Sequence, residues 1–458
     1  MRIAIVAPHF VTDMGYQETG WYTALVSLGH RVRVFASCYV SYTLEKYYKE
    51  PFPEGLSEYR GGEVLRLPAR KLPRNMVRCD GLLREVAAFR PELTLAVYPG
   101  SMFARELFAR RDELPGVLVS TFGDNRAQRR GTGRLKRAAL DAAYFLFKRR
   151  HYRTFIERSD IVLMQTPDTI DFILARTAWS RERERLRERC WLSALGFDPE
   201  VFFPDAEARQ AERRRLNIAE DEVVGLYSCK ITPIKRLDIW VNIMAEAVRR
   251  VPRLRPMLIG IRPGDTECER ILSLIEQTGR KDRFLCLPFA TREQLPRLYN
   301  AADFGVWYMQ PSVTIQEAMG TGVYMILTDS PTASHLVIDP ETGRYFRDAD
   351  YDRLQRLVTE TAAAFAGGDP VSSWEARTRR AAINRERFGY VALAERLVAA
   401  AQDLPNAAAY LRWDGPARPP AGAVRAATAA GVEARTRRGT TGGPGGPHSM
   451  PHRETEAT

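Results

Sequence analysis

Two lysines in the carboxyl-terminal half of the chain are placed where they could bind an anion. Lys230 and Lys235 flank Thr232-Pro233, directly after the apolar run 223–228. Two ammonium groups at the carboxyl end of a parallel strand can act as point charges on a diphosphate. The same residue types also fit two solvated surface lysines. The pattern alone leaves both interpretations open.

Glu317 follows in a second stretch that could bind a nucleotide. Gln310-Pro311-Ser312 separates an apolar run from a short helical pattern, and Ser312 or Thr314 can accept hydrogen bonds from free amides at its start. The backbone amides of Ser312, Val313 and Thr314 form a ready site for a phosphate. One turn further on, the Glu317 carboxylate could accept hydrogen bonds from a ribose diol. An ordinary βαβ unit with a solvated glutamate is the alternative.

Both halves of the chain alternate short apolar runs with helical patterns. This alternation predicts an α/β protein with two doubly wound parallel sheets. A length of 458 residues agrees with two or three domains. We expect strands in the first half at 2–8, 31–37, 63–68, 93–98, 116–122 and 161–166, and in the second at 223–228, 256–260, 284–288, 304–309 and 323–327.

The net charge and the cysteine pattern of the chain indicate which classes of ligand and partner to expect. The net charge of +12 favours an anionic partner such as a sugar nucleotide or an acidic membrane surface. Nucleic acid is not expected, because no recognisable nucleic-acid module is present. The six cysteines are scattered without metal-ligand spacing, which predicts reduced thiols and no structural zinc. We see no signal peptide and no spanning segment, so we expect a cytoplasmic protein.

The segment 126–153 is strongly basic, with ten Lys or Arg residues and a single acidic residue, Asp141. One interpretation is a long surface helix whose cations face water. The other is peripheral contact with the inner face of the membrane or with an anionic acceptor, since basic flanks with interleaved aromatic residues suit a lipid headgroup layer.

Together, the two stretches resemble a known family. Residues 229–235, reading CKITPIK, and residues 317–322, reading EAMGTG, are similar to the nucleotide-sugar half of family 4 glycosyltransferases, which have the GT-B fold. In that fold two Rossmann-like domains face each other across a cleft. The resemblance covers roughly residues 1–400 and is most specific over 225–345.

The resemblance implies a hexosyltransferase of polysaccharide biosynthesis. It would move a sugar from a nucleotide-diphosphate sugar to a glycan, lipid-linked or small-molecule acceptor with retention of configuration, and without a metal or other cofactor. It also implies an acceptor domain at 1–204 and a nucleotide-sugar domain at 205–375. Helices at 376–404 could cross back to the first domain, and the Gly- and Pro-rich residues 405–458 are expected to be disordered.

Family roles transfer to several further positions. Lys230 and Lys235 would stabilise charge on the departing diphosphate, and Gly260 would lie beside the nucleotide. Gly15 stands in the loop that, in relatives, closes over the donor. Asp124 matches the aspartate of a His-Asp pair near the transferred sugar.

Two positions depart from the family pattern. Gly123 replaces the usual histidine, so a hydrogen bond to the sugar must come from elsewhere, such as Asn125 or Arg126. Met309 stands where a first glutamate is common, and Gln310 beside it could replace that glutamate. These departures keep open a weakly active or inactive relative that only binds a sugar nucleotide or glycan, and a sugar-nucleotide epimerase is a further alternative. His335 fits either a site residue or a solvated side chain.

Overall fold

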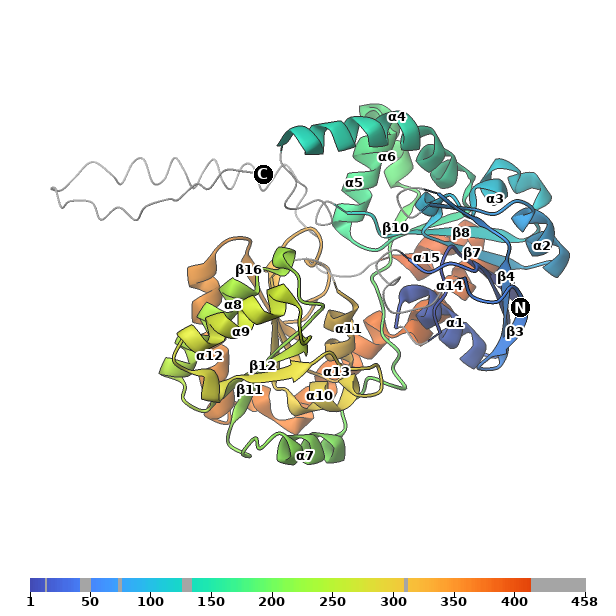
Figure 1. Cartoon of the computed structure of the whole chain (residues 1–458). Helices are drawn as coiled ribbons and strands as arrows, with labels where there is room; N and C mark the ends of the chain where they lie inside the picture. The colour runs from blue at the N-terminus through green and yellow to red at the C-terminus, as the bar shows by residue number, and fades with distance from the viewer. Residues whose placement is uncertain (13–14, 42–50, 73–75, 126–133, 309–311, 413–458) are drawn as a thin grey trace. The chain divides into compact units, whose positions relative to one another are not determined.

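The computed structural model describes residues 1–12, 15–41, 51–72, 76–125, 134–308 and 312–412. Two main sheets organise this part of the chain (Figure 1). The first has eight strands in the order β10-β9-β8-β7-β1-β2-β4-β3, and only the β3–β4 pair is antiparallel. Its strands are β1 (Arg2–Ala7), β2 (Arg31–Ser37), β3 (Gly55–Tyr59), β4 (Gly62–Leu67), β7 (Leu93–Val97), β8 (Val117–Phe122), β9 (Ile161–Met164) and β10 (Cys190–Leu192).

Helices cover both faces of the first sheet because its strands are apolar on both sides. Along β1, Ala4 and Val6 belong to one core, whereas Ile3, Ile5 and Ala7 belong to the other. The first core also takes residues from α2 (Leu82–Phe89), α3 (Arg105–Ala109), α4 (Arg134–Arg158) and α5 (Pro167–Thr177). The second core takes residues from α1 (Gln17–Ser27) and from α14 (Tyr390–Gln402).

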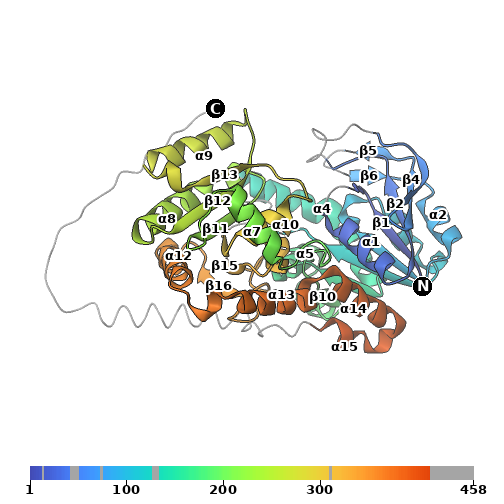
Figure 2. The same ribbon diagram turned by 90° about the horizontal axis from the view of Figure 1, so that it is seen from below.

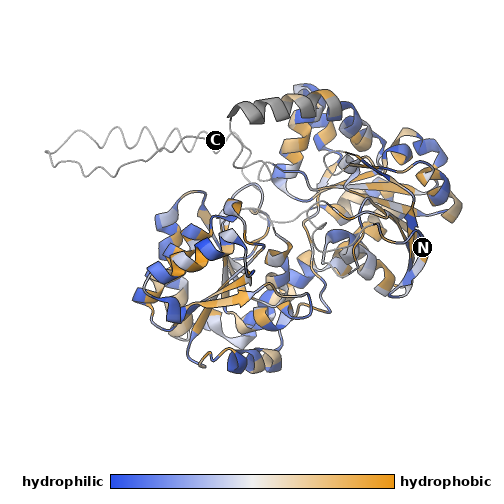
Figure 3. Ribbon diagram, in the orientation of Figure 1, coloured by the Kyte–Doolittle hydropathy of each residue, from blue (hydrophilic) through white to orange (hydrophobic). Residues whose placement is uncertain are grey.

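The second sheet has six parallel strands in the order β13-β12-β11-β14-β15-β16. Figure 3 shows its strands as apolar segments among helices with polar outer faces. The strands are β11 (Val223–Ser228), β12 (Leu254–Ile261), β13 (Leu285–Pro288), β14 (Phe304–Trp307), β15 (Tyr324–Asp329) and β16 (Gly343–Arg347). The main helices are α7 (Ala206–Arg215), α8 (Leu237–Arg250), α9 (Thr266–Gln277), α10 (Leu295–Ala301), α11 (Val313–Gly320) and α12 (Tyr351–Ala366).

The strand orders locate the ligand-binding ends of both sheets. The direction in which successive strands are added to the sheet reverses between β1 and β7 in the first sheet, and between β11 and β14 in the second, although all these strands run parallel. In open parallel sheets, ligands bind beyond the carboxyl ends of the strands at such a switch point. The predicted pair of doubly wound parallel sheets is therefore confirmed, and the switch points show where to look for a site.

The last helices link the two sheets. Helix α13 (Trp374–Phe388) packs against α11, and α14 packs against α1. Figure 2 shows α13 and α14 one after the other in the lower part of the view. At their joint, the Phe197 N–H donates to the Phe388 carbonyl at 3.0 Å, and the Tyr390 N–H donates to the Phe197 carbonyl at 2.9 Å. The two passages of the chain between the sheets are thus hydrogen-bonded to each other.

Several elements differ from the sequence prediction. Strands β3, β10 and β16 and the hairpin of β5 (Arg70–Leu72) and β6 (Met76–Arg78) were not predicted, because short or half-exposed strands carry a weak apolar signal. Disorder from residue 405 is wrong for 405–412, where a turn and α15 (Ala407–Leu411) pack on α14. Ala407 is buried there and Tyr410 packs against the core of the first sheet. The remainder of the predicted tail lies outside the described residues.

Candidate functional site

The carboxyl end of β11 is tied to the start of α11. The Ser228 carbonyl accepts hydrogen bonds from Trp307 Nε1 at 3.1 Å and from Thr314 Oγ1 at 2.9 Å. Ser312 is the N-cap residue of α11 but makes no side-chain capping bond. The expected capping by Ser312 is therefore wrong, and the Thr314 hydroxyl donates to the neighbouring strand. The Ile315 amide donates to the Ser312 carbonyl at 3.0 Å, whereas the preceding amides of Val313 and Thr314 have no partner within the helix.

Lys235 is a buried cation at this end of the sheet. It lies in a single turn of 3-10 helix, Pro233–Lys235, and only 9% of it is exposed, whereas Lys230 is exposed. Burial lowers the pKa of Lys235, and the nearby Cys229 partly opposes this shift. Within the described chain, no carboxylate forms an ion pair with the Lys235 ammonium group. A buried unpaired charge is costly, so a bound anion would relieve that cost.

Glu317 is a buried carboxyl group on α11. Its residue is 5% exposed, and burial raises its pKa from 4.5 to about 7, with Arg292 acting in the opposite direction. A Cβ atom added at Gly15 would lie 2.9 Å from Glu317 Oε1. Gly15 is therefore brought directly against this carboxyl group, and the absence of a side chain permits the approach. Gly15, Glu317, Arg292 and Tyr390 line one narrow cavity.

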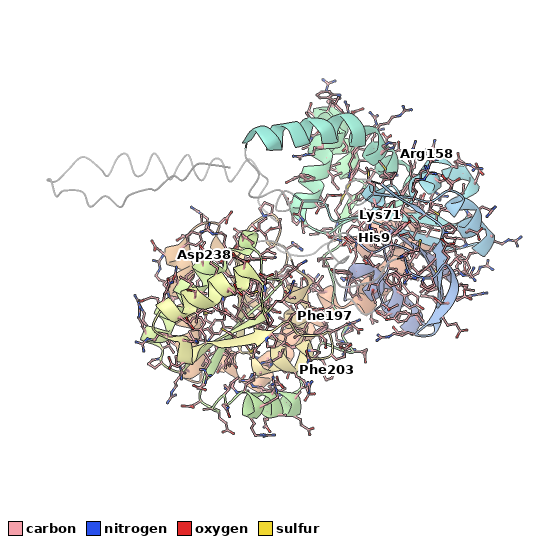
Figure 4. The ribbon with its side chains drawn as sticks, in the orientation of Figure 1. His9, Lys71, Arg158, Phe197, Phe203 and Asp238 are labelled. Carbon is pink, nitrogen blue, oxygen red and sulfur yellow. The ribbon has the colours of Figure 1, made fainter. Side chains whose placement is uncertain are left out.

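Arg292 was not singled out from the sequence. Its Nη2 donates to Asp198 Oδ2 at 2.8 Å, whereas its buried Nε has no partner in the described chain. Asp198 follows Phe197, which Figure 4 labels and whose ring lies against Gly320 of α11. Only the fold shows that Arg292 approaches Glu317, because its local sequence carries no motif.

A second polar cluster lies at the carboxyl edge of the first sheet. Asp124, just beyond β8, accepts a hydrogen bond from the Tyr152 hydroxyl at 2.8 Å. Gln165, just beyond β9, donates from Nε2 to Gln17 Oε1 at 2.7 Å. Glu18 is also buried here, and burial raises its pKa to about 7. Sequence reasoning selected Asp124 as a site residue but not Gln17, Glu18 or Gln165, since isolated Gln and Glu residues at strand or helix ends give no pattern.

Gly260 has a packing role that the sequence did not show. Its φ of +129° is in a region that favours glycine. A Cβ atom there would lie 3.3 Å from the carbonyl carbon of Cys229 and closer still to the carbonyl oxygen. The close approach of β12 to the end of β11 thus requires a glycine, and Gly260 remains only a candidate nucleotide contact.

Three of the site residues predicted from the sequence remain to be located. Met309 and Gln310 lie outside the described residues. His335 is buried, which lowers its pKa to about 3, so the solvated alternative is wrong and the ring is neutral.

The basic segment 126–153 is described only in part. Helix α4 begins at Arg134, so residues 126–133 fall outside the description. Across the described residues, no helix is sufficiently long and apolar to span a membrane.

Residues 208–362 match the family Glycosyl transferases group 1. The D-inositol 3-phosphate glycosyltransferase of Nocardia farcinica is 30% identical over 181 residues, which are 35% of this chain and 40% of that protein. A GDP-mannose-dependent alpha-(1-6)-phosphatidylinositol monomannoside mannosyltransferase of Mycolicibacterium smegmatis is 25% identical over 207 residues, 41% of this chain and 53% of that protein. The chain thus spans about half or less of the length of these curated relatives.

Solved structures resemble the whole described fold. Sucrose-phosphate synthase from Thermosynechococcus elongatus has a TM-score of 0.62 at 19% identity, covering 89% of this chain and 99% of its own. Anabaena Alr3699/HepE in complex with UDP has a TM-score of 0.60 at 15% identity, and the match covers 88% of this chain and 100% of that chain. At such identities the likeness establishes the fold alone. The chain therefore has the GT-B fold, and its second sheet lies in a region that matches the group 1 glycosyl transferases.

Proposed function

We propose that the protein is a glycosyltransferase that takes a hexosyl group from a nucleotide-diphosphate sugar. The observation that carries this proposal is that two buried ionisable groups, the unpaired ammonium group of Lys235 and the carboxyl group of Glu317, both follow strands at the switch point of the second sheet. A cation and uncapped helix amides suit a diphosphate, and a carboxylate suits the ribose diol. The match of residues 208–362 to the group 1 family supports the same assignment.

The roles of the two sheets follow from this placement. Residues 205–375 would hold the nucleotide sugar, and residues 1–204 would hold the acceptor, a glycan or a lipid-linked molecule. Helix α13 fixes α11 from behind: Arg377 Nε donates to the Thr321 carbonyl at 2.8 Å, and Asn384 Nδ2 donates to the Met319 carbonyl at 2.9 Å. The orientation of Glu317 therefore depends on α13 as well as on the sheet.

In the reaction, the bond between the anomeric carbon of the sugar and the diphosphate oxygen breaks, and the acceptor oxygen forms a bond to that carbon. The proton of the acceptor hydroxyl passes to the leaving diphosphate or to solvent. Negative charge then grows on the leaving diphosphate, where Lys235, Lys230 and the amides at 312–314 would stabilise it. These groups would supply positive charge without a metal ion. Retention of configuration is part of the proposal and requires the acceptor to approach from the same side as the leaving group.

The names of similar proteins indicate which nucleotide sugars to test first as the donor. Solved relatives include complexes of Anabaena Alr3699/HepE with UDP and with UDP-glucose, whereas the mycobacterial relative is named for its use of GDP-mannose. We therefore propose UDP- or GDP-linked hexoses as the donors to examine first.

A thermal-shift titration with UDP, GDP, ADP, CMP and dTDP tests the nucleotide site. A ligand that binds only the folded protein raises its melting temperature, so one nucleoside diphosphate should give a selective shift. Lys235→Ala should reduce or abolish the shift, whereas Lys281→Ala should leave it unchanged, because Lys281 lies on the surface and pairs with Glu276. A wild-type protein that is folded and binds none of these nucleotides would contradict the proposal.

A second candidate is a binding module that does not transfer sugar. Gly123 favours it, because a histidine is common at this position in the family that the chain resembles. Hydrolysis or transfer of UDP-glucose or GDP-mannose separates the two candidates: turnover that is lost in Lys235→Ala supports the enzyme, and nucleotide binding without turnover supports the module.

A further inference from the structure

The side chain of Gln165 fills the space beside Gly123. Strands β8 and β9 pair in parallel with Phe122 opposite Met164, and the Gln165 N–H donates to the Phe122 carbonyl at 3.0 Å. This register places Gln165 next to Gly123. A Cβ atom added at Gly123 would lie 2.8 Å from Gln165 Cδ and 3.0 Å from Nε2. Any side chain at position 123 would therefore displace the carboxamide of Gln165.

The carboxamide is held in one orientation. Gln165 Nε2 donates to Gln17 Oε1 at 2.7 Å and lies 3.5 Å from the Tyr98 hydroxyl, and Thr121 Oγ1 donates to the same Gln17 oxygen at 3.3 Å. Both hydrogen bonds of the Gln165 side chain are thus made by its nitrogen. Oε1 points towards Gly123, one residue before Asp124, and keeps its capacity to accept a hydrogen bond.

Neighbouring groups are buried without all their partners. Gln17 Nε2 and Glu18 Oε2 have no hydrogen-bond partner in the described chain, although Gln17 is 3% exposed and Glu18 is 5% exposed. Such groups are costly unless a ligand satisfies them. The set comprises one donor, Gln17 Nε2, and two oxygens that accept a hydrogen bond, Gln165 Oε1 and, when the carboxyl group is ionised, Glu18 Oε2. A sugar ring suits it, because each hydroxyl both donates and accepts.

We propose that Gln165, oriented by Gln17, is a sugar-binding residue that accepts a hydrogen bond from a hydroxyl of the donor's hexose. This inference rests on the proposed function and specifies how the first sheet recognises the sugar. Gly15 supports the assignment to the donor, since it lies against Glu317 only two residues before Gln17. A carboxamide does not titrate, so the Gln165 contact itself has no pH dependence, whereas burial raises the pKa of the neighbouring Glu18 to about 7.

The test compares the affinity of a nucleotide with that of its sugar derivative. Calorimetric titrations would use UDP and UDP-glucose, and GDP and GDP-mannose, on the wild-type protein, Gln165→Leu and Gln277→Leu. The last is a matched control, because Gln277 is exposed at the end of α9. Gln165→Leu should weaken binding of the sugar nucleotide about tenfold, as for one lost hydrogen bond, and should leave binding of the bare diphosphate unchanged. The control should bind both like the wild type.

Exchanging the residues at positions 123 and 165 distinguishes a direct contact of Gln165 with the sugar from a role of Gln165 in packing alone. Gly123→His alone should lose sugar-nucleotide affinity, because the new side chain collides with Gln165. The double variant Gly123→His with Gln165→Ala should regain it, with a dependence on pH between about 5.5 and 7.5 that exceeds the dependence that Glu18 gives the wild type, since imidazole titrates in this range. Equal loss of both ligands in Gln165→Leu, or no loss of either, would overturn the inference, as would a swap variant whose affinity does not recover.

The two proposals fail in different ways. If Gln165→Leu does not fold, Gln165→Asn provides the same comparison, because it shortens the side chain by one methylene and keeps the carboxamide. A wild-type protein that binds no nucleotide refutes the proposed function and this inference with it. A wild-type protein that binds the nucleotide, with no sugar-specific loss in the variants, refutes the inference alone.

Discussion

Replacing Glu317 by Gln should change how the stability of the protein depends on pH. The carboxyl group is buried on α11, and burial raises its pKa from 4.5 to about 7. Below pH 4.5 the group is protonated in both the folded and the unfolded state and has little effect. Between pH 4.5 and 7 the unfolded chain loses this proton while the folded protein keeps it. The unfolded state is therefore favoured progressively as pH rises.

The size of the effect follows from the two pKa values. Each unit of difference corresponds to about 1.4 kcal/mol, so a shift from 4.5 to about 7 costs the folded state about 3 kcal/mol above pH 7. A neutral glutamine of similar shape has no such cost. Relative to the wild type, Glu317→Gln should gain about 2 to 3 kcal/mol in free energy of unfolding between pH 5 and pH 8.

Urea unfolding followed by tryptophan fluorescence measures this difference. Wild type, Glu317→Gln and the control Glu375→Gln would be compared at pH 5, 6, 7 and 8. The control removes an exposed carboxylate at the start of α13 and should follow the wild type. If the curves of Glu317→Gln and the wild type stay parallel from pH 5 to 8, the carboxyl group is not held neutral by burial, and the reasoning fails. The same variant should weaken nucleotide binding, because an amide accepts hydrogen bonds from a diol less strongly than a carboxylate does.

Three other substitutions test separate parts of the structure. Lys235→Met should raise the melting temperature, since it removes a buried unpaired cation, and should weaken binding of the nucleoside diphosphate by about 10- to 100-fold. Thermal unfolding measures the first effect and calorimetry the second. A lower melting temperature with unchanged affinity would contradict the assignment of Lys235 to the nucleotide site. Gly260→Ala should lower the free energy of unfolding in urea by about 2 kcal/mol or more, because the φ of +129° is unfavourable for alanine and the Cys229 carbonyl leaves no room for a methyl group. A variant as stable as the wild type would refute this prediction. Arg377→Met should lower the free energy of unfolding by about 3 kcal/mol in the same assay, because the carbonyls of Thr321, Ala302 and Tyr299 lose their hydrogen-bond donor. The control Arg379→Met, which replaces an exposed side chain, should have little effect.

The sequence alone was sufficient for the fold class, and it selected two residues of the candidate site. Continuous apolar runs such as 223–228 have to be buried on both faces, and their alternation with helical patterns leaves few arrangements other than parallel sheets. Lys235 and Glu317 could be selected because each follows a predicted strand, and the carboxyl ends of parallel strands meet at one edge. The buried state of Lys235 and the pKa of Glu317 could not be obtained in this way, because burial depends on every element that packs around a side chain.

Tertiary structure decided which distant residues meet. The approach of Gly15 and Arg292 to Glu317, the ion pair of Arg292 with Asp198, and the position of Gln165 in the space beside Gly123 all join segments far apart in the chain. Local patterns carry no information on such contacts, because they depend on strand order and register. The missing side chain at position 123 was visible in the sequence as a departure from a family pattern. Only the pairing of β8 with β9 shows that the amide of Gln165 occupies its place.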